Sequence, residues 1–141
     1  TLLKRSLTDE AGKPQKITIG VIGFAPPQIT MWDKALLDGK VVTADMVESA
    51  RHFVPLMKKQ GADVVIALAH SGFEKTPQDV LGENRVGDLV EVAGVDAIVA
   101  GHAHAEFPSA VFSAFPKVDV GQGTINRLLK KPCRKYAYGI V

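Results

Sequence analysis

Three histidines stand where they could bind metal ions. His70 and His102 each directly follow a short apolar run, and His104 comes two residues after His102. Neutral imidazole nitrogen is a good ligand for zinc, manganese, iron and nickel. Small neighbours, Gly72 and Gly101 among them, would let the backbone come close to an ion and its substrate. The three histidines are therefore candidate metal ligands.

Other reactive side chains are weaker candidates. His52 falls on the polar side of a predicted helix and is expected to face solvent. Cys133 lies among lysines and arginines that could favour a thiolate, but no histidine is near it in sequence, so a solvated basic edge is the better interpretation. Trp32 and Asp33 belong to a predicted loop that could approach the histidines, although such a tryptophan is as often a packing residue.

Two kinds of metal site are compatible with these histidines. Three histidines could complete a tetrahedral catalytic zinc site with water as the fourth ligand. Hydrolysis of phosphate esters more often uses two metals about 3.5 to 4 Å apart, which clamp the attacking and leaving oxygens. A two-metal site needs bridging carboxylates, yet Asp63 and Asp96 precede predicted strands and the other acidic residues lie in predicted helices or turns. The sequence contains no evident bridging carboxylate.

The apolar pattern predicts the elements that would carry the histidines. Buried strands are expected over residues 17–24, 62–69 and 95–101, and helices over 44–60 and 84–92. Thr43 is the expected N-cap of the first helix. Continuous apolar strands alternating with helices predict an α/β fold, with parallel strands covered on both faces.

The predicted sheet would gather the histidines at one edge. Ligands of open α/β sheets collect outside the carboxyl ends of the strands. If the chain stays extended beyond Gly101, the two-residue period of a strand places His102 and His104 on the same side. Outside this region, a strand or loop leads into a hairpin near residues 10–14. Short strands are possible at 118–120 and 124–126, and an edge strand at 136–141.

Composition excludes several classes of function. The chain has 141 residues, of which 46% are hydrophobic and 23% charged, as in an ordinary globular domain. A net charge of +2 with scattered basic residues argues against a nucleic-acid polymer as the partner. No apolar run approaches the roughly 20 residues that span a bilayer. The first residues, Thr-Leu-Leu-Lys-Arg, do not resemble a secretory signal, and one cysteine cannot form an internal disulfide.

Several short motifs carry a family resemblance. They are Pro-Pro-Gln at 26–28, Trp-Asp-Lys at 32–34, Ala-His-Ser-Gly at 69–72, Gly-Glu-Asn at 82–84 and Gly-His-Ala-His at 101–104. In this order and spacing, the chain from about residue 17 to 126 resembles the 5′-nucleotidase group of metallophosphoesterases. Within that group it is most similar to the bacterial 2′,3′-cyclic-nucleotide 2′-phosphodiesterase/3′-nucleotidases.

The resemblance implies a fold, a reaction and a set of ligands. The implied fold is a metallophosphatase-type layered sandwich in which helices flank mixed β-sheets. The implied reaction is attack on a nucleotide phosphorus by hydroxide bound to two divalent metals such as manganese, zinc or cobalt. His70 and His102 would bind one metal and His104 the other, while Ser71 and Asn84 are weak candidates for substrate contact. The location implied for the parent protein is the periplasm or cell envelope.

The departures from the family pattern define what the chain can be. The family's Asp-x-His, Gly-Asp and Gly-Asn-His elements include the bridging aspartate. Asp-x-His and Gly-Asn-His are absent, as is the nucleotide-binding domain, and the pair Gly87-Asp88 lies inside a predicted helix, which is the wrong context. We therefore assign residues 1–141 to the C-terminal half of a catalytic domain, which is expected to be inactive alone. Residues 127–141 depart from the family and form a separate tail. The missing half would cover apolar surface, so self-association is expected. The alternative is a non-catalytic α/β remnant that binds one metal weakly or none.

Overall fold

The computed structural model describes residues 1–73, 81–104 and 136–139. These residues form one mixed sheet with helices. In chain order the elements are β1 (Leu2–Thr8), β2 (Pro14–Phe24), α1 (Ile29–Trp32), α2 (Lys34–Leu37), α3 (Met46–Lys59), β3 (Val64–Ala69), α4 (Val86–Leu89), β4 (Ala97–Ala100) and β5 (Tyr136–Gly139). None of the helices described has the length and apolar character needed to cross a bilayer.

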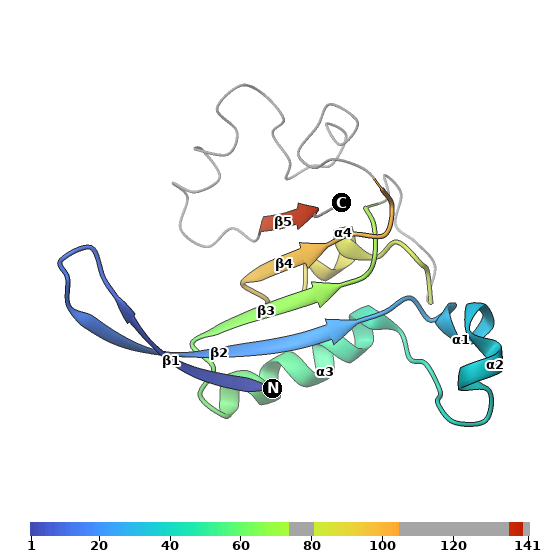
Figure 1. Cartoon of the computed structure of the whole chain (residues 1–141), viewed down its shortest axis with the longest axis horizontal. Helices are drawn as coiled ribbons and strands as arrows, with labels where there is room; N and C mark the ends of the chain where they lie inside the picture. The colour runs from blue at the N-terminus through green and yellow to red at the C-terminus, as the bar shows by residue number, and fades with distance from the viewer. Residues whose placement is uncertain (74–80, 105–135, 140–141) are drawn as a thin grey trace, which may run out of the picture.

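The sheet has the strand order β1-β2-β3-β4-β5 (Figure 1). β1 and β2 form an antiparallel hairpin that projects beyond the other strands, as the sequence suggested for this region. From β2 to β5 all neighbours are parallel. The strand–helix–strand order of β2, α3, β3, α4 and β4 confirms the α/β prediction, and β5 is an edge strand, as expected for that part of the tail.

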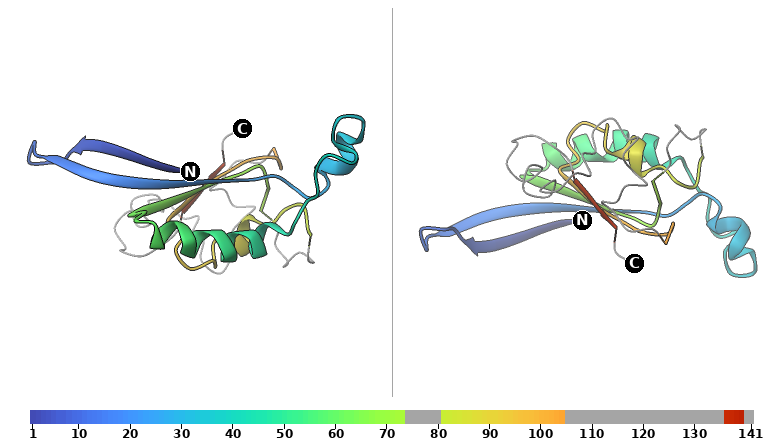
Figure 2. Two further views of the ribbon diagram at one scale, coloured as in Figure 1. Left: turned by 90° about the horizontal axis from the view of Figure 1, so that it is seen from below. Right: turned by 90° about the horizontal axis from the view of Figure 1, so that it is seen from above.

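The helices α3 and α4 lie on the same face of the sheet (Figure 2). Side chains alternate along β3, so Val65, Ala67 and Ala69 are buried beneath the helices. On the other face, Leu68 is 46% exposed. Within the described residues helices cover one face, and the expected cover of the other face stays a prediction.

The first turn of α3 is capped by Asp45, not by Thr43 as the sequence suggested. The Asp45 carboxylate accepts hydrogen bonds from two backbone N–H groups of that turn, both at 2.9 Å. The hydroxyl of Thr43 instead donates to the carbonyl of Pro27 at 3.2 Å. The helix consequently begins two residues later than expected, because a carboxylate at position 45 satisfies the free N–H groups.

The second predicted helix is much shorter than expected, since α4 covers only Val86–Leu89. The residues before it are engaged elsewhere. Asn84 accepts a hydrogen bond from the backbone N–H of Gly72 at 3.1 Å, and the backbone N–H of Arg85 donates to Ser71 at 2.8 Å. These contacts hold residues 84 and 85 against the loop that follows β3 and delay the start of the helix.

The strands β3 and β4 are also shorter than the predicted spans. Aspartates sit at the amino ends of both strands and bind neighbouring backbone. Asp63 accepts a hydrogen bond from the N–H of Thr18, and Asp96 accepts one from the N–H of Val65, both at 2.7 Å. As the sequence suggested, these two carboxylates lie at the end of the sheet opposite the histidines.

Candidate metal centre at the carboxyl ends of the strands

Two of the three predicted ligands lie side by side. β3 and β4 are parallel neighbours, with Ala69 opposite Ala100, so the loops that follow them leave the sheet together. His70 comes directly after β3 and His102 two residues after β4. Their ring centroids are 4.8 Å apart, and Nδ1 of His102 lies 3.1 Å from Nε2 of His70.

This separation of the two nitrogens is compatible with a shared metal ion. Two ligands about 2.1 Å from one ion lie about 3 Å apart when they subtend roughly a right angle. Without an ion, the same distance allows a hydrogen bond in which one ring nitrogen is protonated. Among the residues the structure describes, no third histidine, cysteine or carboxylate completes a metal-binding group with them. His70 and His102 thus supply part of a site.

Glu83, for which the sequence suggested no role, contacts the opposite nitrogen of His102. Its Oε1 is paired with Nε2 of the imidazole. A carboxylate that accepts the proton of one ring nitrogen leaves the lone pair of the other free for a metal, a common arrangement behind histidine ligands. Here the free nitrogen would be Nδ1, which faces His70. Nineteen residues separate Glu83 from His102, so spacing alone could not reveal the contact.

Trp32 forms one side of the candidate site. Its ring stacks on that of His102 with centroids 5.6 Å apart and planes inclined by 25°. The sequence suggested that this segment could approach the histidines, and the ring does so from the end of the short helix α1. Asp33 lies at the junction of α1 and α2, where its backbone N–H bonds the carbonyl of Ile29 at 2.9 Å.

His104 does not form a three-ligand group with His70 and His102 in the described part of the chain. The chain does not remain extended after β4, because φ is +77° at His102 and +50° at His104. The N–H of Ala103 bonds back to the carbonyl of Gly101 at 2.9 Å, which closes a tight turn. The expectation that a period of two aligns His102 with His104 is therefore wrong. Positive φ costs energy for a residue with a side chain, and such strain is concentrated at functional sites.

The two candidates for substrate contact have structural partners here. Ser71 is 0% exposed, and its hydroxyl donates to the carbonyl of Glu83 at 2.9 Å. Asn84 holds the backbone of Gly72, as described above. A Cβ at position 72 would lie 2.5 Å from the Cβ of Ala103, so only glycine permits this approach of the two loops. Ser71 and Asn84 therefore help to fix Glu83 beside His102.

The surroundings of the histidines are open. A shallow hollow of about 560 Å³ lies at the carboxyl ends of β2, β3 and β4, and His70 contributes to its wall with Phe24, Leu68 and Gly101.

His52 is exposed on α3, as expected, and its ring meets the edge of Phe53. Cys133 lies outside the described residues.

Comparison with known proteins identifies the family. The family model described as calcineurin-like phosphoesterase matches residues 10–106, which is more than half of the chain. The chain belongs to the calcineurin-like phosphoesterase family. This family is generally metal-dependent, in agreement with histidines at the strand ends.

Relatives within the calcineurin-like phosphoesterase family include named bacterial enzymes. The chain is 50% identical to the 2′,3′-cyclic-nucleotide 2′-phosphodiesterase/3′-nucleotidase of Salmonella typhimurium, over 86% of this chain and 19% of that protein. It is also 50% identical to the trifunctional nucleotide phosphoesterase protein YfkN of Bacillus subtilis, over 87% of this chain and 8% of YfkN.

A solved structure of this phosphoesterase family is also similar. The crystal structure of calcineurin-like phosphoesterase YfkN from Bacillus subtilis has a TM-score of 0.85 and 44% identity, and the match covers 99% of this chain and 40% of that one. The chain spans less than a fifth of the length of these curated relatives.

Proposed function

We propose that this chain supplies the histidine side of a two-metal site in a catalytic domain that hydrolyses phosphoester bonds in nucleotides. The observation that carries the proposal is the convergence of His70 and His102 at the strand ends of a calcineurin-like phosphoesterase. Two relatives are named as 2′,3′-cyclic-nucleotide 2′-phosphodiesterase/3′-nucleotidases, and these names favour 2′,3′-cyclic nucleotides and 3′-nucleotides as substrates.

The residues of the chain have distinct parts in this proposal. Nε2 of His70 and Nδ1 of His102 would hold one divalent ion, and His104 would hold the second, as the family resemblance implies. When bound, two such ions stabilise the attacking and leaving oxygens of an in-line displacement. Glu83 fixes the proton of His102 on Nε2, and Trp32 shields one face of the His102 ring from water.

The bridging carboxylate and the nucleotide-binding residues belong to other parts of the parent protein. The chain itself offers Glu83 alone as a carboxylate in contact with the described histidines, and Glu83 is turned to the far nitrogen of His102. The parent is a periplasmic or cell-envelope protein in this proposal, as the resemblance implies.

The alternative is a non-catalytic remnant that binds one metal weakly or none. Two described ligands, both at an open surface, are compatible with it. A chimera separates the two functions: this chain replaces the aligned segment of the YfkN phosphoesterase domain. The measurements are manganese binding by calorimetry and hydrolysis of 2′,3′-cyclic AMP.

The proposed function predicts a chimera that binds manganese and hydrolyses the cyclic nucleotide. His102→Ala should abolish most of both, whereas His52→Ala, on the exposed side of α3, should change neither. A folded chimera that binds no manganese, or one that keeps full activity with His102→Ala, would support the remnant instead.

A further inference from the structure

Leu81 has a backbone conformation that needs support from outside its own segment. Its φ is +66°, in the left-handed region that residues with a side chain rarely adopt. The conformation is unfavourable because it brings the Cβ close to the following carbonyl oxygen. The side chain of Leu81 is 46% exposed, so it is only partly packed against the rest of the chain. Such a conformation persists where the surrounding structure fixes it.

Two side chains from other elements hold the backbone of Leu81, one on each side of its Cα. Oδ2 of Asp45, at the start of α3, accepts a hydrogen bond from the N–H of Leu81 at 3.0 Å. Nε2 of Gln28, at the start of α1, donates to the carbonyl of Leu81 at 2.9 Å. The two bonds together fix the direction of the chain two residues before Glu83.

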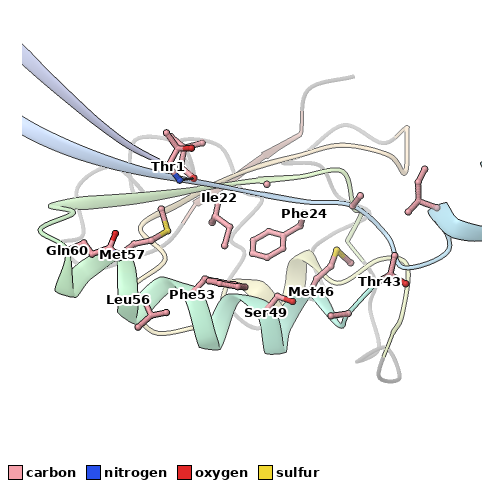
Figure 3. Close-up of a pocket in the computed structure, with 15 residues that line it drawn as sticks. Thr1, Ile22, Phe24, Thr43, Met46, Ser49, Phe53, Leu56, Met57 and Gln60 are labelled. Atoms are coloured by element: carbon pink, nitrogen blue, oxygen red, sulfur yellow. Dashed lines mark hydrogen bonds between the residues drawn. The ribbon is translucent and has the colours of Figure 1, made fainter. Parts of the chain in front are cut away.

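Gln28 belongs to the Pro-Pro-Gln motif at 26–28, which has no part in the proposed reaction. Both prolines of the motif are buried. The carbonyl of Pro27 accepts hydrogen bonds from the hydroxyls of Thr30 and Thr43, at 3.1 and 3.2 Å. Thr43 lies at the end of the hollow between β2 and α3, beside the start of that helix (Figure 3). The motif is therefore tied to the segment that leads into α3, and the side chain of Gln28 extends from a fixed backbone.

The side chain of Gln28 is not used by its own helix. Gln28 stands at the N-cap position of α1, but its side chain makes no capping hydrogen bond there. The amide nitrogen bonds Leu81 instead, and the amide oxygen is buried without a hydrogen-bond partner among the residues that the structure describes. A buried acceptor without a partner lowers stability. Stability alone therefore does not account for a glutamine at this position.

The two segments that Gln28 joins are the ones that contact His102. Trp32 lies at the end of α1, which Gln28 begins, and its ring stacks on the imidazole. Glu83 follows Leu81 by two residues and pairs with Nε2 of His102. The hydrogen bond between Gln28 and Leu81 thus closes a ring of contacts around His102.

We propose that Gln28 is a positioning residue for the metal centre, which acts through Leu81 to hold Glu83 against His102. The proposal rests on the proposed function in one respect, that His102 is a metal ligand. Without the bond from Gln28, the backbone of Leu81 relaxes toward negative φ, and the chain changes direction just before Glu83. The carboxylate then leaves Nε2 for part of the time, and the ring proton moves to Nδ1, the nitrogen that faces His70.

Gln28→Met tests the hydrogen bond while the size of the side chain is kept. Methionine removes the donor and also the buried oxygen without a partner, so the midpoint of thermal unfolding should change little. The ratio of Nε2-protonated to Nδ1-protonated His102 is read from its nitrogen chemical shifts at a pH where the ring is neutral. This ratio should fall about two- to tenfold, the range that corresponds to the loss of one hydrogen bond.

The matched control is Gln15→Met. Gln15 also makes one side-chain hydrogen bond through its amide nitrogen, to Asp9 in the hairpin at 2.8 Å. Its replacement should leave the tautomer ratio of His102 as it is in the unaltered chain. An unchanged ratio in Gln28→Met would overturn the proposal, and so would equal ratios in the two variants.

Substitution of Leu81 separates positioning from packing. Glycine adopts positive φ about as readily as negative φ, so Leu81→Gly combined with Gln28→Met should recover part of the lost ratio. Leu81→Ala combined with Gln28→Met removes the same exposed side chain beyond Cβ but keeps the unfavourable φ, and it should recover nothing. An equal response to glycine and alanine at position 81 would contradict a role that acts through the backbone of Leu81.

These measurements need no metal, so their failure is distinguishable from failure of the proposed reaction. In the YfkN chimera, Gln28→Met should weaken manganese binding by a factor similar to the change in the tautomer ratio, and Gln15→Met should not change it. Full manganese affinity in Gln28→Met would overturn the role in the metal centre. A shifted tautomer ratio in a chain whose chimera binds no manganese would support the positioning of His102 and reject the proposed function.

Discussion

At the scale of single residues, His102 is the centre of the candidate site. Its two ring nitrogens face different partners, His70 and Glu83, and Trp32 stacks on its face. Its backbone has a φ of +77°, which few residues with a side chain adopt. Three side-chain contacts from three other segments of the chain hold this conformation. The ring is therefore oriented before any metal binds.

Glu83 should set the tautomer of His102. Replacing it with alanine removes the acceptor at Nε2, and loss of such a partner typically weakens metal binding by about 10- to 100-fold. Glu83→Gln retains a neutral acceptor and should give an intermediate effect. Trp32 is the sole tryptophan, so quenching of its fluorescence by cobalt measures binding at the neighbouring ring. Nitrogen chemical shifts of His102 report the tautomer without metal.

The matched control for Glu83 is Glu48→Gln. Glu48 is an exposed carboxylate on α3 that pairs with Arg51 and has no recorded contact with His70 or His102. It should leave both the cobalt titration and the tautomer of His102 unchanged. An unaltered tautomer in Glu83→Ala would contradict the positioning role, whatever happens to affinity.

At the scale of elements, a buried ion pair joins the start of α3 to the start of α4. Nη1 of Arg85 lies 2.9 Å from Oδ2 of Asp45, and both side chains are less than a tenth exposed. The same oxygen accepts the backbone N–H of Leu81 at 3.0 Å. Asp45 therefore caps one helix and holds the segment that carries Glu83. Stability of α3 and geometry of the site depend on one carboxylate.

Asp45→Asn should destabilise the chain. Burial by itself raises the pKa of the Asp45 carboxyl, but hydrogen bonds from the N–H groups of Glu48 and Leu81 and the charge of Arg85 outweigh burial, so the pKa is lowered. Asparagine can still cap the helix. It removes the carboxylate charge beside the Arg85 guanidinium, which keeps its pairing with Asp88. We expect a loss of about 2 to 3 kcal/mol at neutral pH in urea unfolding.

The pH dependence of the stability lost in Asp45→Asn follows from the lowered pKa of the Asp45 carboxyl. A lowered pKa in the folded state means that Asp45 contributes stability above its unfolded pKa of about 4, and that this contribution is lost as the pH falls through the folded value. Asp45→Asn should therefore show a weaker loss of stability in acid than the unaltered chain. Asp38→Asn, at an exposed position, should retain the full dependence. Identical acid profiles for the two variants would argue against the ion pair.

The elements were largely predictable from the sequence, whereas their ends and the site's inner contacts were not. Apolar runs identify β2, β3 and β4 because burial leaves a local signal in the chain. The cap at Asp45 uses N–H groups of the adjacent turn, but its ion pair with Arg85 joins residues 40 apart, and the contact of Ser71 with Arg85 that delays α4 joins residues 14 apart. The turn at His102 likewise depends on Glu83 and His70. Local patterns do not encode such contacts.

At the scale of the whole molecule, the described sheet has two unlike faces. The helices α3 and α4 lie on one face (Figure 2), where they cover the core. The other face presents the alternate residues of the central strands. On that second face the strand registers place Ile66 beside Val21, and Leu68 beside Val99. This row of apolar side chains is contiguous across three strands and ends at the hollow beside His70. Apolar surface of this kind marks a place of association.

Leu68 should control self-association of the isolated chain. It lies in the middle of the apolar row and is 46% exposed, so Leu68→Thr removes apolar surface while threonine keeps the preference for a strand. Sedimentation velocity over a concentration series should show association for the unaltered chain and weaker association for Leu68→Thr. Leu36→Thr, at a more exposed leucine on the separate helix α2, should change little, because contiguity of the surface and not exposure of one residue drives contact. If the isolated chain stayed a monomer at every concentration, other residues of the same chain would have to cover this apolar face. The assignment of the chain to one half of a catalytic domain would then lose its main physical support.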